Sequence, residues 1–273
     1  MRTGFPRIRA VALLAVGLGV LLVLDGTGEG RSAQPTGTGS RAAATQPAAA
    51  IPAAISVQQP LRFAGLNRSY RLVTPAATRG PLPLLVVLHG ASASALQEMQ
   101  RTGVGGLAGG QAVLAGPESV GPAWNTGAGC CGVAVTDHVD DTGFVTAVIA
   151  DAQRRAAVDP ARIYLLGYSS GGKLAYNVAC TDGGALAAIA VYGAGPQAGC
   201  PGAAALPFIV GYGDADPEEP LAGAPNDAHG AHPPVAQTLA QLRTLNGCAP
   251  SSAAVRTVAP ASITTWSACR SGA

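Results

Sequence analysis

The sequence is poor in charged residues, and this scarcity limits what the chain can bind. Only 12% of the 273 residues are charged, and the formal net charge is +2. Residues 1–33 hold four arginines and two carboxylates, so the rest of the chain carries no net charge. Because the folded part has no excess of positive charge, it has no electrostatic basis for binding nucleic acid or an anionic membrane. The 48% share of hydrophobic residues favours one large globular domain with its own core.

The longest apolar run lies at the N-terminus. Arg2, Arg7 and Arg9 precede an apolar stretch over residues 10–24, which is short for a membrane-spanning helix of about 20 residues. A basic segment followed by an apolar run of this length is typical of a secretory signal. We therefore predict a signal peptide over residues 1–25 and a secreted protein, with an uncleaved N-terminal anchor as the alternative. No cysteine follows the run closely, which argues against a lipoprotein anchor, and we expect no stable membrane association after cleavage.

The next segment lacks the apolar periodicity of helices and strands. Residues 26–59 are rich in Gly, Ala, Thr, Ser, Pro and Gln, which is typical of a flexible linker. The sequence does not define one signal cleavage site, and residues 31–33 and 42–44 are the two options. We predict that the folded domain occupies residues 60–273.

The chain also lacks any C-x-x-C spacing, which weakens a zinc interpretation, so we predict no metal and no cofactor. Six cysteines in an exported chain instead favour disulfides. Six cysteines allow 15 pairings. The most local expectation is Cys248–Cys269, followed by Cys180–Cys200. The adjacent Cys130 and Cys131 then pair with each other or with other cysteines.

Beyond residue 60, apolar runs of the kind found in strands alternate with helical patterns. Leu84–Leu88 is apolar throughout, as expected for a parallel strand covered on both faces. Apolar residues recur at helical spacing over 141–158, where Asp140 or Asp141 is placed to cap the helix. The other predicted strands are 70–74, 112–115, 163–166, 187–192 and 208–212, and the other predicted helices are 95–101, 171–179 and 234–245. This alternation predicts a mainly parallel sheet with helices on both faces.

One pentapeptide carries the strongest chemical signal. Gly167-Tyr168-Ser169-Ser170-Gly171 follows the apolar strand 163–166 and opens a helical pattern. This is the G-x-S-x-G pattern in its strand–turn–helix context, which predicts Ser169 as an exposed nucleophile at the end of a strand. A serine hydroxyl is a weak nucleophile alone, so it needs a neighbouring base. An ordinary glycine-rich turn is the alternative.

Two further segments follow predicted strands at the same edge of the sheet. His89-Gly90 follows the strand 84–88, and in α/β-hydrolases this loop supplies one oxyanion-hole N–H while the residue after the nucleophile supplies the other. These N–H groups belong here to Ala91 and Ser170. We expect His89 to organise this loop on the substrate-binding side rather than to act as the general base.

The acid of the site is expected after a late strand. Gly213-Asp214-Ala215-Asp216-Pro217 follows the strand 208–212. We predict that Asp216 orients the catalytic histidine and stabilises its cation, with Asp214 as the rival. A turn rich in aspartate without a catalytic role is the third interpretation.

These motifs together resemble a known family of secreted esterases. The segments that carry the resemblance are, in chain order, His89-Gly90, Trp124-Asn125 with Cys130-Cys131, Val139–Phe144, Val158–Tyr164, the Ser169 pentapeptide, Gly213–Pro217 and Asn246–Cys248. They are similar to polyhydroxybutyrate depolymerase-like and feruloyl esterase-like α/β-hydrolases of carbohydrate esterase family one, from about Tyr70 to Cys269. The resemblance implies an α/β-hydrolase fold and ester hydrolysis through Ser169, Asp216 and a histidine. It implies a polymer or plant cell-wall ester as substrate and does not select among polyhydroxyalkanoate, feruloyl and acetyl esters.

The family pattern departs from this chain at the histidine. In that family the histidine follows a further strand beyond the segment that contains Cys269, whereas no histidine follows His232 here. We therefore expect a last strand and closing helix to be missing, as in a truncated product. His229 and His232 are the weaker candidates for the base, and His138 is expected at the surface or in the cleft. A non-catalytic protein with an esterase fold is the alternative function, and a peptidase is a more distant one.

Trp124 and Asn125 complete the predicted site. They lie in a loop where ligands bind in parallel sheets. We assign both to substrate binding, with Trp124 as an aromatic wall for an apolar or phenolic acyl group. Packing of Trp124 in the core is the alternative.

Overall fold

The computed structural model describes residues 19–24, 54–127, 130, 132–197, 204–224, 230–249, 253–258 and 260–270. Within these ranges, ten strands form one sheet in the order β2-β3-β5-β4-β6-β7-β8-β1-β10-β9. The strands are β1 (Gly19–Leu24), β2 (Ala54–Phe63), β3 (Leu66–Pro75), β4 (Leu82–Leu88), β5 (Val113–Pro117), β6 (Val158–Tyr168), β7 (Ala188–Tyr192), β8 (Phe208–Gly213), β9 (Ala253–Val258) and β10 (Ala261–Trp266). The stretch from β5 through β4, β6, β7 and β8 to β1 is parallel, and antiparallel pairs lie at both ends.

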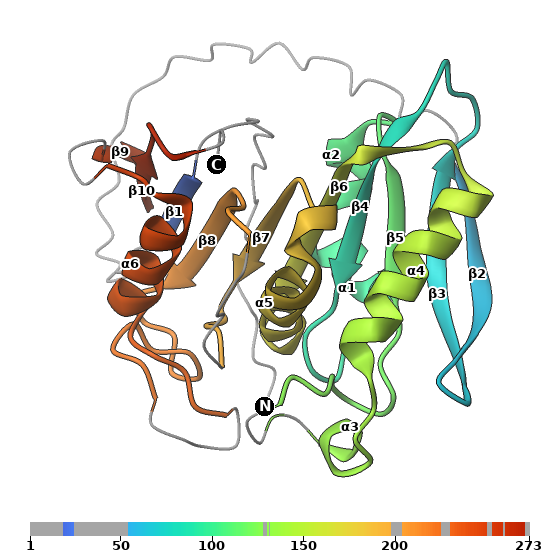
Figure 1. Cartoon of the computed structure of the whole chain (residues 1–273), viewed down its shortest axis with the longest axis horizontal. Coiled ribbons are helices and arrows are strands. Elements are labelled where there is room, and N and C mark those ends of the chain that lie inside the picture. The colour runs from blue at the N-terminus through green and yellow to red at the C-terminus, as the bar shows by residue number, and fades with distance from the viewer. Residues whose placement is uncertain are drawn as a thin grey trace, which may run out of the picture.

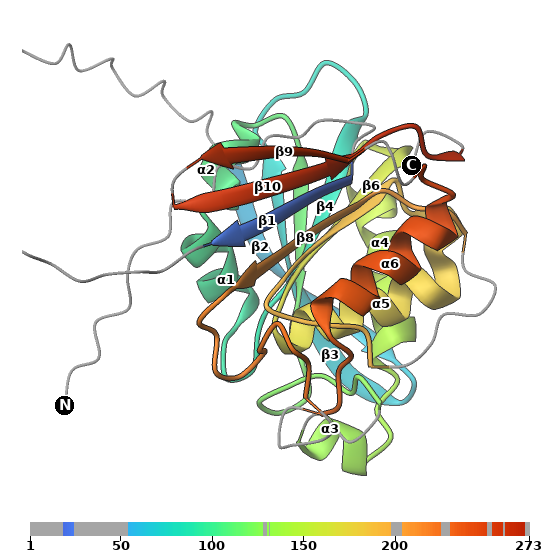
Figure 2. The ribbon, with the colours of Figure 1, turned by 90° about the vertical axis from the view of Figure 1, so that its left-hand side faces the viewer.

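Helices cover both faces of this sheet. They are α1 (Ala95–Thr102), α2 (Val104–Ala108), α3 (Val133–Thr136), α4 (Asp141–Arg155), α5 (Ser170–Asp182), the short 3-10 helix η1 (Gly183–Ala185) and α6 (Val235–Asn246). Figure 1 shows α4, α5 and α6 in front of the sheet. The view turned by 90° shows α1 and α2 on the opposite face (Figure 2). The predicted fold class, an α/β-hydrolase fold with a mainly parallel sheet, is confirmed.

Strand β4 shows why its sequence is apolar throughout. Successive side chains of a strand point to opposite faces. Leu84, Val86 and Leu88 belong to the large core cluster that includes residues of α4 and α5. Val87 packs in a second cluster with Met99 of α1. Both faces of β4 are therefore buried, as predicted for a central parallel strand.

The shared direction of the parallel strands assembles the site. The arrowheads of β4, β7 and β8 point to the lower edge of the sheet in Figure 1. β6 is parallel to both β4 and β7, so it ends at the same edge. Segments far apart in the sequence, after Leu88, Tyr168, Tyr192 and Gly213, are thereby brought to one edge. Ligands bind at this edge in open parallel sheets.

The boundaries differ most from the expectations in two places. α4 ends at Arg155 rather than near Val158, and β6 already begins at Val158, before the predicted strand 163–166. β2 begins at Ala54, so residues 54–59 belong to the sheet and not to the predicted linker. In β2, Ile55 and Val57 alternate with Ser56 and Gln58, a strand pattern that the linker-like composition obscured.

The chain after α6 contains more sheet than expected. β9 and β10 form an antiparallel pair, and β10 also pairs with β1. β1 lies between β8 and β10 (Figure 2) and belongs to the stretch predicted as a signal peptide. The remainder of residues 1–53 lies outside the described residues.

The Cys248–Cys269 disulfide is confirmed. Cys130 and Cys180 are also disulfide-bonded. Cys131 and Cys200 lie outside the described residues, so the predicted Cys180–Cys200 pair stays a prediction. In the part of the chain that the structure describes, no helix is long and apolar enough to span a membrane.

Candidate active site

Ser169 occupies the sharp turn between β6 and α5. Its backbone has φ 51° and ψ −121°, in a region that residues with a side chain rarely adopt. A Cβ on Gly167 would lie 2.4 Å from the carbonyl oxygen of Gly171, and one on Gly171 would lie 2.3 Å from that of Leu88. The two glycines therefore let the strand and the helix cross closely, as the motif predicts. Gly172, which the motif does not specify, is similarly enclosed by Val191 and Ala194.

The loop after β4 lies beside this turn. A Cβ on Gly90 would lie 3.5 Å from the Cβ of Ser169 and would collide with the ring of Tyr168. Among the hydrogen bonds of the described residues, the backbone N–H groups of Ala91 and Ser170 have no acceptor. Ser170 is the first residue of α5, where N–H groups have no partner within the helix. Both predicted oxyanion donors are thus free in adjacent segments.

The buried side chain of His89 fixes this loop through polar contacts of both ring nitrogens. Its side chain is buried, Nδ1 contacts the carbonyl oxygen of Gly90 at 2.8 Å, and Nε2 accepts a hydrogen bond from the N–H of Ser119 at 3.3 Å. With these partners Nδ1 serves as the donor and Nε2 as the acceptor. The predicted role in organising the loop agrees with this geometry. Placement on the substrate side does not, because both ring nitrogens are engaged in the interior.

Trp124 corrects the prediction of an aromatic wall. Its side chain has 0% exposure and belongs to the large core cluster. The indole N–H donates to the carbonyl oxygen of His89 at 2.8 Å, and the two rings lie 4.7 Å apart. Burial of a large aromatic surface and one satisfied N–H favour this interior position. Trp124 therefore supports the loop after β4 instead of lining a cleft.

Asn125 likewise forms its hydrogen bonds with other residues of the protein. Its backbone N–H donates to Asp141 at 2.7 Å, and its amide nitrogen donates to the carbonyl oxygen of Val139 at 2.8 Å. Asp141 also forms a buried ion pair with Arg68 at 2.7 Å. Asp140 caps α4 by accepting from the N–H of Gly143. The predicted substrate-binding residue thus fixes a loop, and only its partly exposed face is open to a ligand.

Asp216 lies in a tight turn after β8. Its Oδ1 accepts from the backbone N–H groups of Glu218 and Glu219 at 2.9 and 3.0 Å. A Cβ on Gly193, directly after β7, would lie 3.8 Å from Oδ2. Burial, and to a lesser extent the charge of Asp216, raises the pKa of both Tyr168 and Tyr192. The carboxylate therefore lies close to the residues that flank Ser169, with Oδ2 facing the end of β7, while Asp214 is exposed.

The other three histidines differ in where they lie. His232 is buried, its Nε2 lies 3.4 Å from Glu219, and its Nδ1 contacts the carbonyl oxygen of Pro233 at 3.3 Å. His138 is exposed, which fits the expected surface position. His229 lies outside the described residues. Across the described ranges, no hydrogen bond joins the Ser169 hydroxyl to a histidine.

Two groups near the site were missed by sequence reasoning. Arg101 of α1 stacks on the ring of Tyr168 at 3.8 Å, and Tyr168 stacks on Tyr192 at 5.9 Å between ring centres. Glu219 forms a buried ion pair with Lys173 of α5. Burial raises the pKa of Glu219, and the Lys173 ammonium opposes that shift. Lys173 and Glu219 lie in different elements, so the sequence alone gives no signal of this ion pair.

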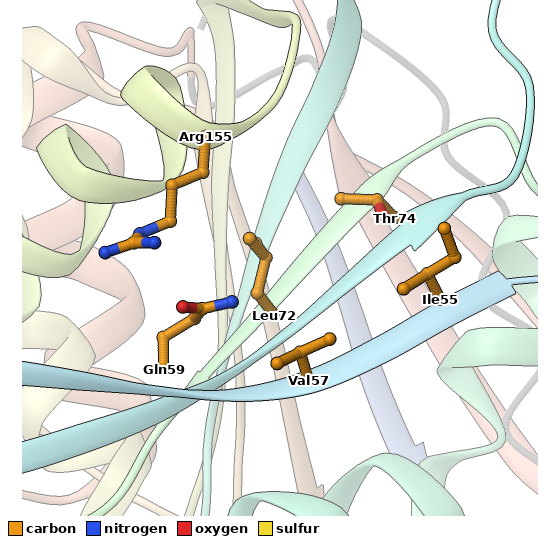
Figure 3. A pocket seen from close by; sticks show the side chains of 6 residues that line it. All are labelled: Ile55, Val57, Gln59, Leu72, Thr74 and Arg155. Atoms are coloured by element: carbon orange, nitrogen blue, oxygen red, sulfur yellow. The ribbon is translucent and has the colours of Figure 1, made fainter.

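A surface cavity lies elsewhere. It has a volume of about 330 Å³. Figure 3 shows its lining, made by Ile55, Val57, Gln59, Leu72, Thr74 and Arg155. These residues belong to β2, β3 and the end of α4, and none of them is a predicted site residue.

The fold and the turn at Ser169 define this chain as an α/β-hydrolase in architecture. Residues 133–226 match the model of the dienelactone hydrolase family. The chain is 33% identical over 183 residues to the NocK protein of Nocardia uniformis subsp. tsuyamanensis, which is named as a proposed esterase. That alignment covers 63% of this chain and 53% of the relative, so the chain spans about half the length of that protein.

Solved structures agree with this architecture. A thermostable esterase superposes with a TM-score of 0.52 at 19% identity, covering 70% of this chain and 52% of the other. A dienelactone hydrolase-like promiscuous phosphotriesterase from metagenomic libraries superposes with a TM-score of 0.51 at 14% identity, covering 71% and 78%. These likenesses support the fold. The family model and the curated relative support ester hydrolysis in general. They do not identify a substrate.

Proposed function

We propose that this protein hydrolyses carboxylic esters through an acyl-serine intermediate on Ser169. The observation that carries the proposal is the Ser169 backbone, which is strained at a turn between β6 and α5 that glycines 167 and 171 keep close. Strain of about 1–3 kcal/mol at one residue persists only where the surrounding structure enforces it, and such sites are frequently functional.

The chemistry follows from the groups at this edge of the sheet. The Ser169 oxygen attacks the ester carbonyl carbon as a histidine takes its proton. The carbonyl oxygen becomes an oxyanion, and the N–H groups of Ala91 and Ser170 donate to it. Each such donor contributes about 3 kcal/mol to the transition state. The histidine then protonates the leaving alcohol, and a water molecule releases the acid from the serine.

Asp216 is proposed to orient that histidine. Its Oδ1 is already engaged by two backbone N–H groups, so Oδ2 is the oxygen left for an imidazole. Oδ2 faces Gly193, and the carbonyl oxygen of the preceding Tyr192 accepts the N–H of Ser169. This arrangement supports a path from carboxylate to serine along the ends of β7 and β6.

The substrate and the compartment extend the proposal. We propose an exported enzyme acting on polyhydroxyalkanoate, feruloyl or acetyl esters, from the basic and apolar N-terminus and the motif order. The Cys248–Cys269 disulfide supports an oxidising compartment.

A second function is favoured by one observation. Within the described ranges, the Ser169 hydroxyl has no hydrogen-bond partner, and both nitrogens of His232 face other groups. A binding protein that keeps the esterase fold without turnover would show this arrangement.

One experiment decides between the two functions. The purified full chain and Ser169→Ala are incubated with a fluorophosphonate probe and with short p-nitrophenyl esters. We expect the wild-type chain to be labelled and to turn over the esters, and Ser169→Ala to do neither. The loss of a catalytic-triad residue lowers kcat by a factor on the order of 10⁶. His229→Ala and His232→Ala then show which histidine acts. A folded wild-type chain with neither signal would refute the esterase proposal.

A further inference from the structure

A buried cluster of charge links the Asp216 turn to the helix that begins at Ser169. Lys173 of α5 and Glu219 of the turn after β8 contact at 2.5 Å between Nζ and Oε1. His232 lies on the other carboxylate oxygen, with 3.4 Å between Nε2 and Oε2. The side chains of these three residues are 2%, 4% and 0% exposed. Ionisable groups buried this deeply are rare unless they are paired.

Each end of the cluster is tied to one half of the proposed site. The N–H of Lys173 donates to the carbonyl oxygen of Ser169 at 3.0 Å, one helical turn after the nucleophile. The N–H of Glu219 donates to Oδ1 of Asp216 at 3.0 Å. The ion pair therefore connects the backbone of the nucleophile to the carboxylate of the acid through two hydrogen bonds and one salt bridge.

His232 fixes the third side of the cluster. Its backbone exchanges two hydrogen bonds with Ala224, at 3.0 and 3.1 Å. A Cβ on Gly195, which follows β7, would lie 3.2 Å from the Cβ of His232. The loop before α6 thus holds the imidazole next to Oε2 of Glu219, the carboxylate oxygen other than the one that Lys173 contacts.

We propose that Lys173 and Glu219 are positioning residues, whose buried pair, supported by His232, sets the placement of Asp216 relative to Ser169. This inference rests on the proposed ester hydrolysis. A pair with a purely structural role would be replaceable without effect on turnover, because well-packed apolar groups stabilise a fold as well as a buried ion pair does. The pair is a buried charged contact between the loop after β8 and α5.

The test separates positioning from stability. Lys173→Met, Glu219→Gln and the double variant are compared with the wild-type chain. The double variant removes both charges of the pair and keeps the proposal testable where a single variant fails to fold. Asp151→Asn is the matched control, because Asp151 is a buried carboxylate that pairs with Arg154 and Arg155 at the far end of α4.

For each chain, kcat and KM are measured separately on p-nitrophenyl esters, at a temperature well below the melting temperature of every variant. We expect kcat to fall between about tenfold and a hundredfold with KM within about twofold, because small misplacements of reacting groups cost this much. The double variant should lose no more than the worse single one, since the two residues act as one unit. Asp151→Asn should keep its kcat despite a lower melting temperature. Folded Lys173 and Glu219 variants with wild-type kcat, or an equal loss in the control, would overturn the proposal.

A second readout does not depend on turnover. Hydrogen exchange of the peptide spanning residues 213–219 reports the N–H groups of Glu218 and Glu219 that bind Asp216. We expect faster exchange there in Lys173→Met and in the double variant, and no change in Asp151→Asn. Unchanged exchange overturns the anchoring of the turn. A wild-type chain without turnover overturns the proposed function and the positioning role, even where the exchange data support the anchor.

Discussion

Glycines at the Ser169 turn are required by contacts with backbone atoms, which cannot move aside as a flexible side chain can. A Cβ on Gly171 would lie 2.3 Å from the carbonyl oxygen of Leu88 and 2.6 Å from that of His89. We expect Gly171→Ala to lose about 1–3 kcal/mol of unfolding free energy through overpacking. It should also lower kcat, because α5 must move away from the loop after β4, which carries the proposed oxyanion donor Ala91. Urea unfolding and ester kinetics measure the two effects.

Gly80→Ala is the matched control for that change. Gly80 lies in a loop where an added Cβ meets no atom within 4 Å. Wild-type stability and turnover in Gly171→Ala would show that the close crossing of β6 and α5 is not required.

Trp124 acts on the site through one hydrogen bond. Trp124→Phe keeps an aromatic ring but removes the N–H that satisfies the carbonyl oxygen of His89. A buried acceptor left without a partner costs about 1–3 kcal/mol. We expect that loss in urea unfolding, with a lower kcat and an unchanged KM.

Trp266→Phe is the comparison for this variant. The indole N–H of Trp266 is buried without a hydrogen-bond partner among the described residues. Its replacement removes no bond and should leave kcat unchanged. A KM effect in Trp124→Phe without a change of kcat would instead favour the aromatic wall predicted from the sequence.

At the scale of residues, local patterns were predictable and side-chain directions were not. Ser169 and its two glycines follow from a motif whose backbone requirements are local. The turn position of Asp216 follows from the strand that precedes it. Trp124 was misplaced because its position in a loop does not tell which way the ring points. The contact of Lys173 with Glu219 joins residues 46 positions apart in number, and a single sequence carries no record of it.

At the scale of elements, the far end of α4 is held by one buried carboxylate. Asp151 accepts from Tyr70 at 2.7 Å, from Arg154 at 2.8 Å and from Arg155 at 2.6 Å. Burial by itself raises the pKa of Asp151, but these donors outweigh burial and hold it below its ordinary value of 3.8. The ionised form therefore stabilises the folded state above the unfolded pKa, and this stability is lost as the pH falls through the folded pKa.

Asp151→Asn makes this dependence measurable. We expect the variant to be about 2 kcal/mol less stable than the wild-type chain at pH 7, the size of a hydrogen bond to a charged group. The difference should shrink as the pH falls below about 4, where the unfolded carboxyl takes up its proton. Urea unfolding at pH 7, 5 and 3 measures it. A difference that is constant with pH would contradict the role of the ionised carboxylate.

Elements with a clear period were predicted, and those hidden by composition were not. β4 and α5 carry long apolar or periodic runs and appear where expected, whereas β6 contains the predicted strand 163–166 but begins earlier, at Val158. β2 was not predicted because Pro60 and the preceding glutamines resemble a linker, although apolar and polar residues alternate at its start. β9 escaped because it lies at the end of the sheet and all of its residues are exposed, so it has no buried face to impose a pattern.

At the scale of the whole molecule, one apolar segment has two mutually exclusive fates. Gly19–Leu24 forms β1, parallel to β8 and antiparallel to β10. The same segment is the apolar part of the predicted secretory signal. A strand between two others satisfies backbone groups on both of its sides, so its removal leaves two unpaired edges. Cleavage on export would therefore free the edge of β8 for another strand.

The mature N-terminus distinguishes these fates. We expect the chain with a C-terminal tag to appear in the medium of an exporting host, shortened to begin after residues 31–33 or 42–44, because the basic and apolar start is typical of a cleaved signal. Intact mass and N-terminal sequencing measure this. Replacing Arg2, Arg7 and Arg9 by glutamine should retain the chain inside the cell while leaving the strands of the sheet unaltered. A full-length chain in the medium, with residues 19–24 protected from hydrogen exchange, would establish β1 as a permanent strand and refute the signal.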